Sequence, residues 1–411
     1  MFPVEILEIL FKYSDGADII NFRGVCNTWN EIIVKLSKDT NLWRVKCERE
    51  ISICNRKSIH AKLYPKMSWL ELHQSVDNLI WLTIYQSWLR WCRLQKSEFS
   101  KEQFEPFFIG LPFVTITCLS VLENLLAVGS SEGFITFYNI DGSTTEPIFI
   151  ADQKEYVSTV EFLKEWRGRE IEAISLSNMH RMMLWNITTQ EVISRQTYGK
   201  FMRIFHCCST TNTRILRAIG SQLTVQENNK ERTYDFVRHN GTIVALATDG
   251  EQALLWTDVG FTYEIDLNNT DSEYVEQYVR PPLKRVRQYY LFGHWVSMCI
   301  TEDGILGISV NHKPWKMYNI LPYLHGYPTS LLYYASMLVL GLDSGSMHIY
   351  HVKDIASLTN QHFCSSNSKA IIIDNQAIIL LDIMERPGKQ YMIAATSEKV
   401  TIIKFRDLMS K

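Results

Sequence analysis

The stretch FPVEILEILF, residues 2–11, decides how the N-terminal part of this chain folds. Its apolar residues recur at the spacing of an α-helix, with Leu7 and Phe11 one turn apart on the same stripe. Pro3 suits the start of a helix because its missing N–H would have no partner there in any case. We therefore expect a short amphipathic helix that ends before Asp15-Gly16.

A second apolar run begins at Ile19 and continues at helical spacing through Val25-Cys26-Asn27-Thr28-Trp29 to Leu42-Trp43, which predicts a compact unit of three helices. The early proline, the Val-Cys-x-x-Trp cluster and the Leu-Trp pair together resemble the F-box. Members of that family dock onto a Skp-type adaptor of a cullin-RING ubiquitin ligase. The family usually begins Leu-Pro, and Phe2 replaces that leucine conservatively. The resemblance implies an adaptor interface made of Pro3, Ile6, Leu7, Ile9, Phe11, Val25, Cys26 and Trp29.

Two alternatives remain open for this segment. It could be a small helical bundle of no special purpose, and a residue such as Trp29 could belong only to the core. Amphipathic spacing alone does not separate these alternatives from an F-box. The combination of motifs favours the F-box.

Length and composition bound the function classes. A chain of 411 residues exceeds one ordinary core, so two or more domains are expected. The net charge of -2 provides no overall field to attract nucleic acid or an anionic membrane. There is no basic n-region with a small-residue cleavage site, and the uncharged stretch 78–89 is too short to cross a bilayer. We expect a protein of the cytosol or nucleus with no membrane span, whose nine cysteines remain thiols.

A second helical block follows between Cys54 and Leu94. Ser68-Trp69-Leu70-Glu71 fits a capping box, so a helix is expected to start there and to carry one apolar face from Trp69 to Ile80. The next turns, 81–91, are rich in tryptophan. This pattern is similar to the linker helices of F-box proteins that carry propellers.

From about residue 105 the pattern changes to short β-rich runs that recur at roughly 40-residue intervals, the period of a propeller blade. The clearest unit comprises 114–121, 125–129 and 134–140, and its ending resembles the WD repeat with Tyr-Asn in place of Trp-Asp. Further endings are expected at 183–187, 223–225, 261–265, 315–320, 347–352 and 400–405. In the fifth unit Gly293-His294 resembles the family's other marker, and 296–301 and 305–310 should be the strands that follow it. These units predict a WD-like β-propeller of seven blades.

The last unit has room for only three strands, because the chain ends soon after Phe405. We expect Phe107-Phe108-Ile109-Gly110 to supply its fourth strand and so close the ring, which would remove an exposed sheet edge.

Motifs for catalysis or metal binding are not found in the sequence. The densest set of possible ligands, His206-Cys207-Cys208, places adjacent cysteines on opposite faces of a strand, where they cannot bind one ion together. Nucleophile-elbow, zinc-protease and phosphate-loop patterns are missing. We expect no cofactor, no metal and no intrinsic enzyme activity.

In WD-type propellers the fourth-to-first and second-to-third strand connections form the usual binding rim. The residues expected there are Arg181, Lys200, Arg203, Arg238, His239 and Lys313. Arginines at this rim read phosphorylated peptides in several related receptors, since guanidinium groups match phosphate in bidentate fashion. Acidic residues occupy comparable loops, so an ordinary mixed surface is the alternative.

The sequence thus predicts a multidomain α plus all-β protein: an F-box at 1–50, a helical linker at 51–104 and a propeller at 105–411. The resemblance implies a substrate receptor that binds a Skp-family adaptor, and through it a cullin-RING ligase, and that holds an unknown protein substrate, phosphorylated or not. Nucleic acid and membrane are not expected partners. The competing hypothesis is a propeller scaffold that assembles complexes without promoting ubiquitylation.

Overall fold

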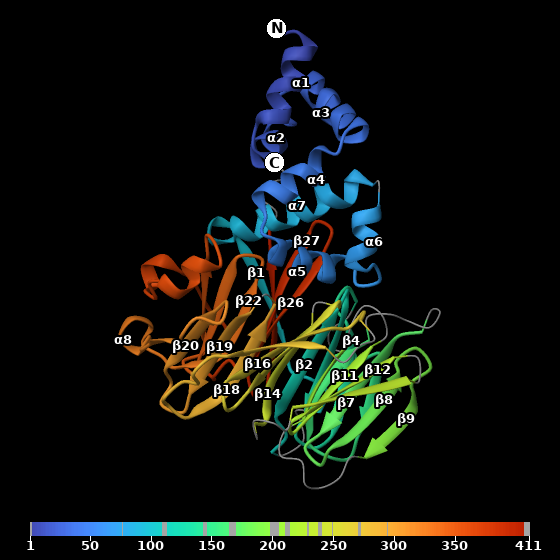
Figure 1. Cartoon of the computed structure of the whole chain (residues 1–411), viewed down its shortest axis with the longest axis vertical. Helices are drawn as coiled ribbons and strands as arrows, with labels where there is room; N and C mark the ends of the chain where they lie inside the picture. Colours follow the sequence, from blue (N-terminus) through green and yellow to red (C-terminus); the bar gives the residue numbers. More distant parts are fainter. Residues whose placement is uncertain are drawn as a thin grey trace.

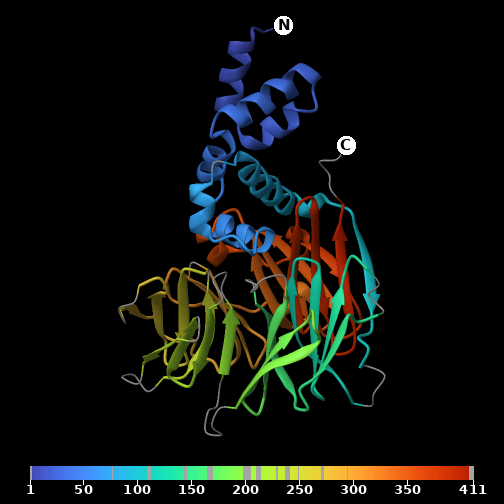
Figure 2. The same ribbon diagram turned by 90° about the vertical axis from the view of Figure 1, so that its right-hand side faces the viewer.

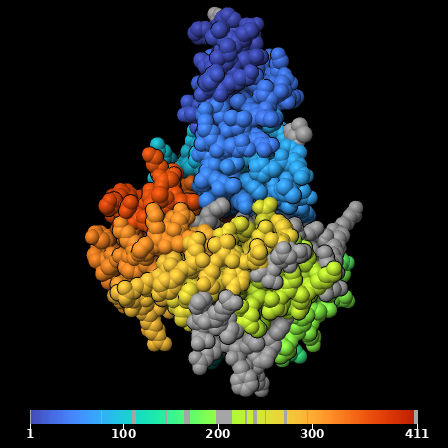
Figure 3. Space-filling view, viewed as in Figure 1, coloured from blue at the N-terminus to red at the C-terminus, as the bar shows by residue number. Residues whose placement is uncertain are grey.

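The computed structural model describes residues 2–75, 77–108, 113–142, 146–163, 170–197, 214–227, 230–236, 241–248, 250–269, 273–293 and 295–406, together with the backbone of 205–209. A helical arm stands on one face of a ring of β-sheets (Figure 1). In the space-filling view the arm projects from the ring as a narrow column (Figure 3). Among the described helices, none has the length and apolar character needed to cross a membrane.

The arm consists of short helices joined by tight turns. They are α1 (Val4–Tyr13), α2 (Gly16–Phe22), α3 (Asn27–Asp39), α4 (Leu42–Glu50), α5 (Ile53–Leu63), α6 (Trp69–Gln74), α7 (Asn78–Cys92) and the 3-10 turn η1 (Leu94–Lys96). The predicted first helix is confirmed, with Leu7 and Phe11 on its buried side. The capping box is confirmed as well: Ser68 Oγ accepts from the Glu71 amide at 3.2 Å, and Glu71 Oε2 accepts from the Ser68 amide at 2.6 Å.

The predicted single apolar face from Trp69 to Ile80 is wrong, because two helices share this segment. Helix α6 ends at Gln74, and α7 begins with a new cap in which Asp77 Oδ1 accepts from the Leu79 amide at 2.8 Å. Val76 lies outside the described residues. The break lets α7 turn and lie across the propeller (Figure 2).

Seven four-stranded antiparallel sheets form the propeller, which confirms the predicted blade count. The first strands of most neighbouring blades contact one another around the centre of the ring. Blades one to three are β2 (Ile116–Leu122), β3 (Leu125–Ser130), β4 (Phe134–Asn139) and β5 (Phe149–Asp152); β6 (Val157–Phe162), β7 (Glu172–Ser177), β8 (Arg181–Asn186) and β9 (Glu191–Thr197); and β10 (Phe205–Ser209), β11 (Ile215–Ile219), β12 (Gln222–Glu227) and β13 (Lys230–Asp235).

Blades four to six are β14 (Ile243–Thr248), β15 (Gln252–Thr257), β16 (Phe261–Asp266) and β17 (Tyr274–Tyr278); β18 (Val286–Phe292), β19 (Val296–Thr301), β20 (Leu306–Val310) and β21 (Lys316–Tyr318); and β22 (Pro328–Tyr334), β23 (Met337–Leu342), β24 (Ser346–His351) and β25 (Lys369–Ile372). Blade seven is β26 (Leu380–Arg386), β27 (Lys389–Ala395) and β28 (Val400–Phe405), completed by β1 (Phe99–Phe104).

An N-terminal strand does close the ring, but it is not the predicted one. Strand β1 pairs antiparallel with β28, from Phe99 opposite Phe405 to Phe104 opposite Val400. It lies within the segment 51–104 that the sequence assigned to the helical linker. Phe107 and Phe108 instead form a turn towards blade one, where the Phe107 amide donates to Tyr138 Oη at 2.9 Å. Residues 109 and 110 lie outside the described residues.

The strand order of blade five also differs from the prediction. Its third strand is β20, and the predicted ending 315–320 holds the outer strand β21. Gly293 lies in the turn between β18 and β19, so it does not precede the first strand of a blade. His294 lies outside the described residues. The shift of one strand changes which end of the blade each connection occupies.

Arm and propeller share one continuous hydrophobic core. This core runs from Leu7 in the arm to Ile403 in blade seven and includes Trp81 and Trp91 of α7. The Trp91 ring contacts Tyr334 of β22 with ring centroids 5.7 Å apart. The arm therefore has a packed, fixed orientation on blades six and seven (Figures 1 and 2).

Candidate functional site

The first candidate surface is an apolar stripe on α1 that no described residue covers. Ile6 and Ile9 are 48% and 53% exposed, and Tyr13, one further turn along, is 80% exposed. Leu10 lies on the same stripe and is 39% exposed. A run of half-exposed apolar side chains on one helix face indicates a protein interaction site.

The structure divides the eight predicted adaptor-binding residues into two groups. Leu7 and Phe11 are buried, and the centroid of the Trp29 ring lies 5.4 Å from those of Phe11 and of Phe22. Leu7, Phe11 and Trp29 therefore hold the arm together. The exposed residues are Pro3, Ile6, Ile9, Val25 and Cys26. Helix α1 is apolar on two sides, and the sequence alone did not show which side faces its own core.

Polar contacts fix α1 and α2 to the rest of the arm. The buried Lys46 ammonium donates to the carbonyl oxygens of Lys12 at 2.8 Å and of Ser14 at 2.5 Å, which satisfies the end of α1. Burial lowers the pKa of Lys46. The Glu50 carboxylate accepts from the Gly16 amide at 3.1 Å and from Tyr85 Oη of α7 at 2.5 Å. The exposed stripe is thereby held in a defined direction relative to α7.

The second candidate surface is the propeller rim that faces away from the arm. First-to-second and third-to-fourth strand connections lie on the arm side: Asn55 of α5 donates to Ser336 Oγ at 2.6 Å, and Lys57 pairs with Glu251 at 3.2 Å. The other connections therefore form the far rim, because successive turns of an antiparallel sheet alternate between its two ends. Arg181 begins β8 on that far rim, and its guanidinium pairs with Glu155 at 2.8 Å.

Only part of the predicted substrate set can be placed. Lys200, Arg203, Arg238 and His239 lie outside the described residues. Lys313 does not share the rim of Arg181, because it lies between β20 and β21, a third-to-fourth strand connection on the arm side. The error in the strand order of blade five caused this misplacement.

The β17–β18 connection contributes far-rim residues that sequence analysis missed. It exposes Leu283 (87%) beside Lys284 and Arg285, which pair with Asp303 and Glu302 of the neighbouring turn. The sequence RPPLKR at 280–285 could have indicated this surface, because two prolines stiffen a connection that carries three cations.

Bulges repeat at the far-rim end of the inner strands. The register slips at the second residue of β2, β6, β14, β18 and β22. Three such residues bond forward to the start of the next blade: Thr117 Oγ1 donates to the Val157 carbonyl at 2.5 Å, Arg287 Nη2 to the Pro328 carbonyl at 3.3 Å, and Thr329 Oγ1 to the Ile378 carbonyl at 2.7 Å. Bulges re-aim side chains, so Arg287 adds a cation near the centre of this rim.

Comparison with known proteins gives two matches. Residues 1–41 match the F-box domain family. The chain therefore carries an F-box domain at its N-terminus, followed by a seven-bladed propeller. It is also 30% identical over 149 residues to cell division control protein 4 of Saccharomyces cerevisiae, a match that covers 33% of this chain. The matched part spans 17% of the length of that relative. Among the described residues, no group of three or more His, Cys, Asp or Glu side chains lies close enough to share a metal ion.

Proposed function

We propose that this F-box protein is a substrate receptor of a Skp-cullin-F-box ubiquitin ligase. The exposed stripe of α1, with Ile6 and Ile9 at its centre, carries the proposal. It belongs to the segment that matches the F-box family, whose members dock on a Skp-type adaptor. Docking would bury the half-exposed isoleucines and remove their apolar surface from water, which favours association.

The proposed mechanism is proximity rather than chemistry by this chain. The continuous core between arm and propeller fixes the distance and direction from the docking stripe to the far rim. A target held on the propeller would then lie in a defined position relative to the ligase. In this role the chain is a non-catalytic subunit that works in the cytosol or nucleus.

The target is proposed to bind on the far rim. Lys284 and Arg285 pair there with half-exposed carboxylates, and Arg181 pairs with the carboxylate of Glu155, whose side chain is 19% exposed. Surface pairs of this kind contribute little to stability, about 0 to 1 kcal/mol, so a target phosphate or carboxylate can replace the internal partner. The exposed Leu283 offers an apolar contact beside them. We therefore propose an acidic or phosphorylated segment as the target feature.

Affinity purification from cells, with and without proteasome inhibition, tests this function. The full chain should recover a Skp-type adaptor, a cullin and target proteins whose ubiquitylated forms increase when the proteasome is inhibited. A variant with Ile6→Asp and Ile9→Asp should keep the targets and lose both the adaptor and the ubiquitylation. If the bound proteins are ubiquitylated equally with the parent chain and with the double variant, the competing scaffold function is favoured.

A further inference from the structure

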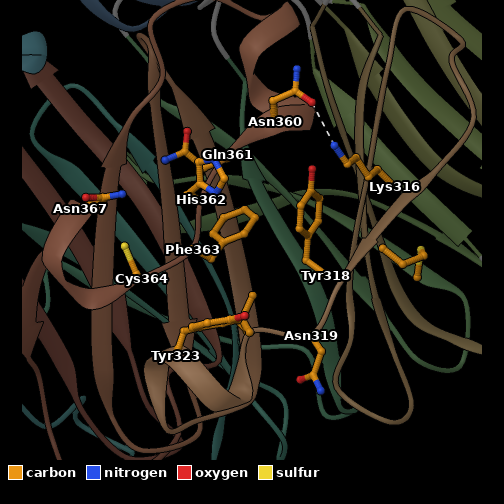
Figure 4. A pocket seen from close by; sticks show the side chains of 12 residues that line it. Lys316, Tyr318, Asn319, Tyr323, Asn360, Gln361, His362, Phe363, Cys364 and Asn367 are labelled. Carbon is orange, nitrogen blue, oxygen red and sulfur yellow. Dashed lines mark hydrogen bonds between the residues drawn. The ribbon is translucent and has the colours of Figure 1, made fainter.

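A slot lies on the flank of the propeller between blades five and six, away from both candidate surfaces. It has a volume of about 870 Å³ and is lined by two runs of consecutive residues, 316–320 and 360–364. The first run contains the whole outer strand β21, and the second follows the 3-10 turn η3 (Ala356–Asn360) in the long connection between β24 and β25. Figure 4 shows the two walls facing each other.

The floor of the slot is aromatic and well packed. Tyr318 and Phe363 come from opposite walls and meet edge to face with ring centroids 5.0 Å apart. Phe363 packs in turn on the buried ring of Tyr350, 5.4 Å away. At one end Lys316 Nζ donates to Asn360 Oδ1 at 2.9 Å, which joins the walls (Figure 4). The slot therefore has a packed floor and is closed at one end by a hydrogen bond between its walls.

The groups along the slot suit a peptide main chain. Strand β21 is the outer strand of its sheet, so one edge of its backbone faces away from β20. An extended segment can add to such an edge by main-chain hydrogen bonds. The opposite wall and its neighbourhood supply side-chain amides, which both donate and accept: Asn360, Gln361 and Asn367. Five residues of extended chain span about 17 Å, which sets the length of the bound segment.

The charges around the slot indicate that the bound peptide segment is acidic. A second hollow of about 630 Å³ adjoins the slot through the shared residues Gln361 and Asn367 and reaches η1 of the arm. The two hollows present three lysines: Lys316 lines the slot, and Lys96 and Lys369 line the second hollow, where Lys369 Nζ donates to the Leu94 carbonyl at 3.2 Å. His351 adds no positive charge at neutral pH, because burial lowers its pKa. Among the described residues, no aspartate or glutamate lines either hollow. The chain as a whole carries a net charge of -2, so these lysines form a local excess of cations on the flank.

We propose that this flank slot binds an extended, acidic peptide segment of a partner protein, which adds as a further strand to blade five. The amide-lined walls and the open strand edge favour a peptide over a nucleic acid, which needs arginine or lysine contacts along a phosphate backbone. The site is distinct from the far rim. It stands whether or not the chain acts as a ligase receptor.

The test begins with a library of random 12-residue peptides displayed on phage and selected against the full chain. Selected peptides are synthesised with a fluorescein label, and their affinities are measured by fluorescence anisotropy. We expect peptides rich in Asp and Glu that bind about tenfold more weakly to Lys316→Glu, because one attractive contact becomes repulsive. Lys316→Arg should restore binding.

Two matched controls locate the site. Lys353→Glu changes an exposed lysine of the same connection that does not line the slot, and Lys284→Glu changes the far rim. Both should bind the selected peptides as the parent does. Four outcomes would each overturn the proposal. The selection yields no acidic peptide, Lys353→Glu loses as much peptide affinity as Lys316→Glu, only Lys284→Glu loses peptide affinity, or a labelled 20-nucleotide oligo-dT binds more tightly than the peptides. Melting temperatures by circular dichroism show whether every variant is folded.

Discussion

Replacing Glu385 with glutamine should change how stability at the junction of arm and propeller depends on pH. Glu385 is 2% exposed and accepts hydrogen bonds from Trp91 Nε1 at 2.9 Å, from the Tyr334 hydroxyl and from Gln390 Nε2 at 3.5 Å. Burial outweighs these bonds and raises the pKa of its carboxyl group from 4.5 to about 7. The network joins α7 to blades six and seven, so its state affects the whole junction.

The raised pKa of Glu385 determines whether this group adds to or subtracts from stability as the pH changes. The folded protein binds the Glu385 proton more tightly than the unfolded chain, so this group stabilises the fold at low pH and loses that contribution as the pH rises from about 4.5 to about 7. Over the interval from pH 5 to pH 8 the loss is on the order of 2 to 3 kcal/mol. Other charged groups near the junction are Arg90 of α7 and Asp382, which pairs with Lys62 of α5 at 2.8 Å.

Urea unfolding of the parent and of Glu385→Gln at pH 5 and pH 8 measures this effect. The variant should gain roughly 2 to 3 kcal/mol relative to the parent between the two pH values. His60 acts in the opposite direction, because burial lowers its pKa to about 4 and its contribution is lost as the pH falls below 6.5. It is present in both proteins and cancels in the comparison. Parallel pH dependences of parent and variant would refute the reasoning.

Two further predictions concern the propeller. In hydrogen exchange, the amides of β1 that pair with β28 should be protected together with those of β28, and fast exchange of 99–104 beside a protected 400–405 would contradict ring closure by β1. Gly345→Ala should destabilise the protein by about 2 to 4 kcal/mol, because φ is +75° and a Cβ would lie 2.0 Å from the Asp374 carbonyl oxygen. Gly388→Ala is the matched control, because φ there is +77° and no atom lies within 4 Å of the added Cβ. It should reduce the free energy of unfolding by only about 1 to 2 kcal/mol. Equal losses for the two variants in thermal unfolding would show that the contact with Asp374 is irrelevant.

The sequence was sufficient for the fold where local patterns match the final structure. Helical spacing identified α1, the capping box identified the start of α6, and the 40-residue period identified the blades. It failed for β1, whose sequence FSKEQF alternates poorly and is charged. Such composition is usual for an outer strand, which has little to bury, so the apolar Phe107-Phe108 appeared to be the better strand.

The interaction surfaces were harder to predict than the fold. A helix with apolar residues on two sides, such as α1, does not reveal which side its own core covers. Only the burial of Leu7 and Phe11, and the packing of Phe11 against Trp29, showed that these two residues are structural. In blade five a one-strand error moved Lys313 to the opposite rim. The flank slot depends on residues about 45 positions apart, 316–320 and 360–364, which no local pattern connects.

The docking stripe is the central claim, and a binding measurement with a purified Skp-type adaptor tests it most directly. Ile6→Asp with Ile9→Asp places two carboxylates in the proposed interface, while both positions are half exposed in the free protein and tolerate the change. Two unpaired carboxylates buried on binding cost at least about 4 kcal/mol, which weakens affinity about a thousandfold. Leu70→Asp, at a 60% exposed position of α6, is the matched control and should bind as the parent does. Unchanged affinity of the double variant, with an unchanged melting temperature, would contradict the account.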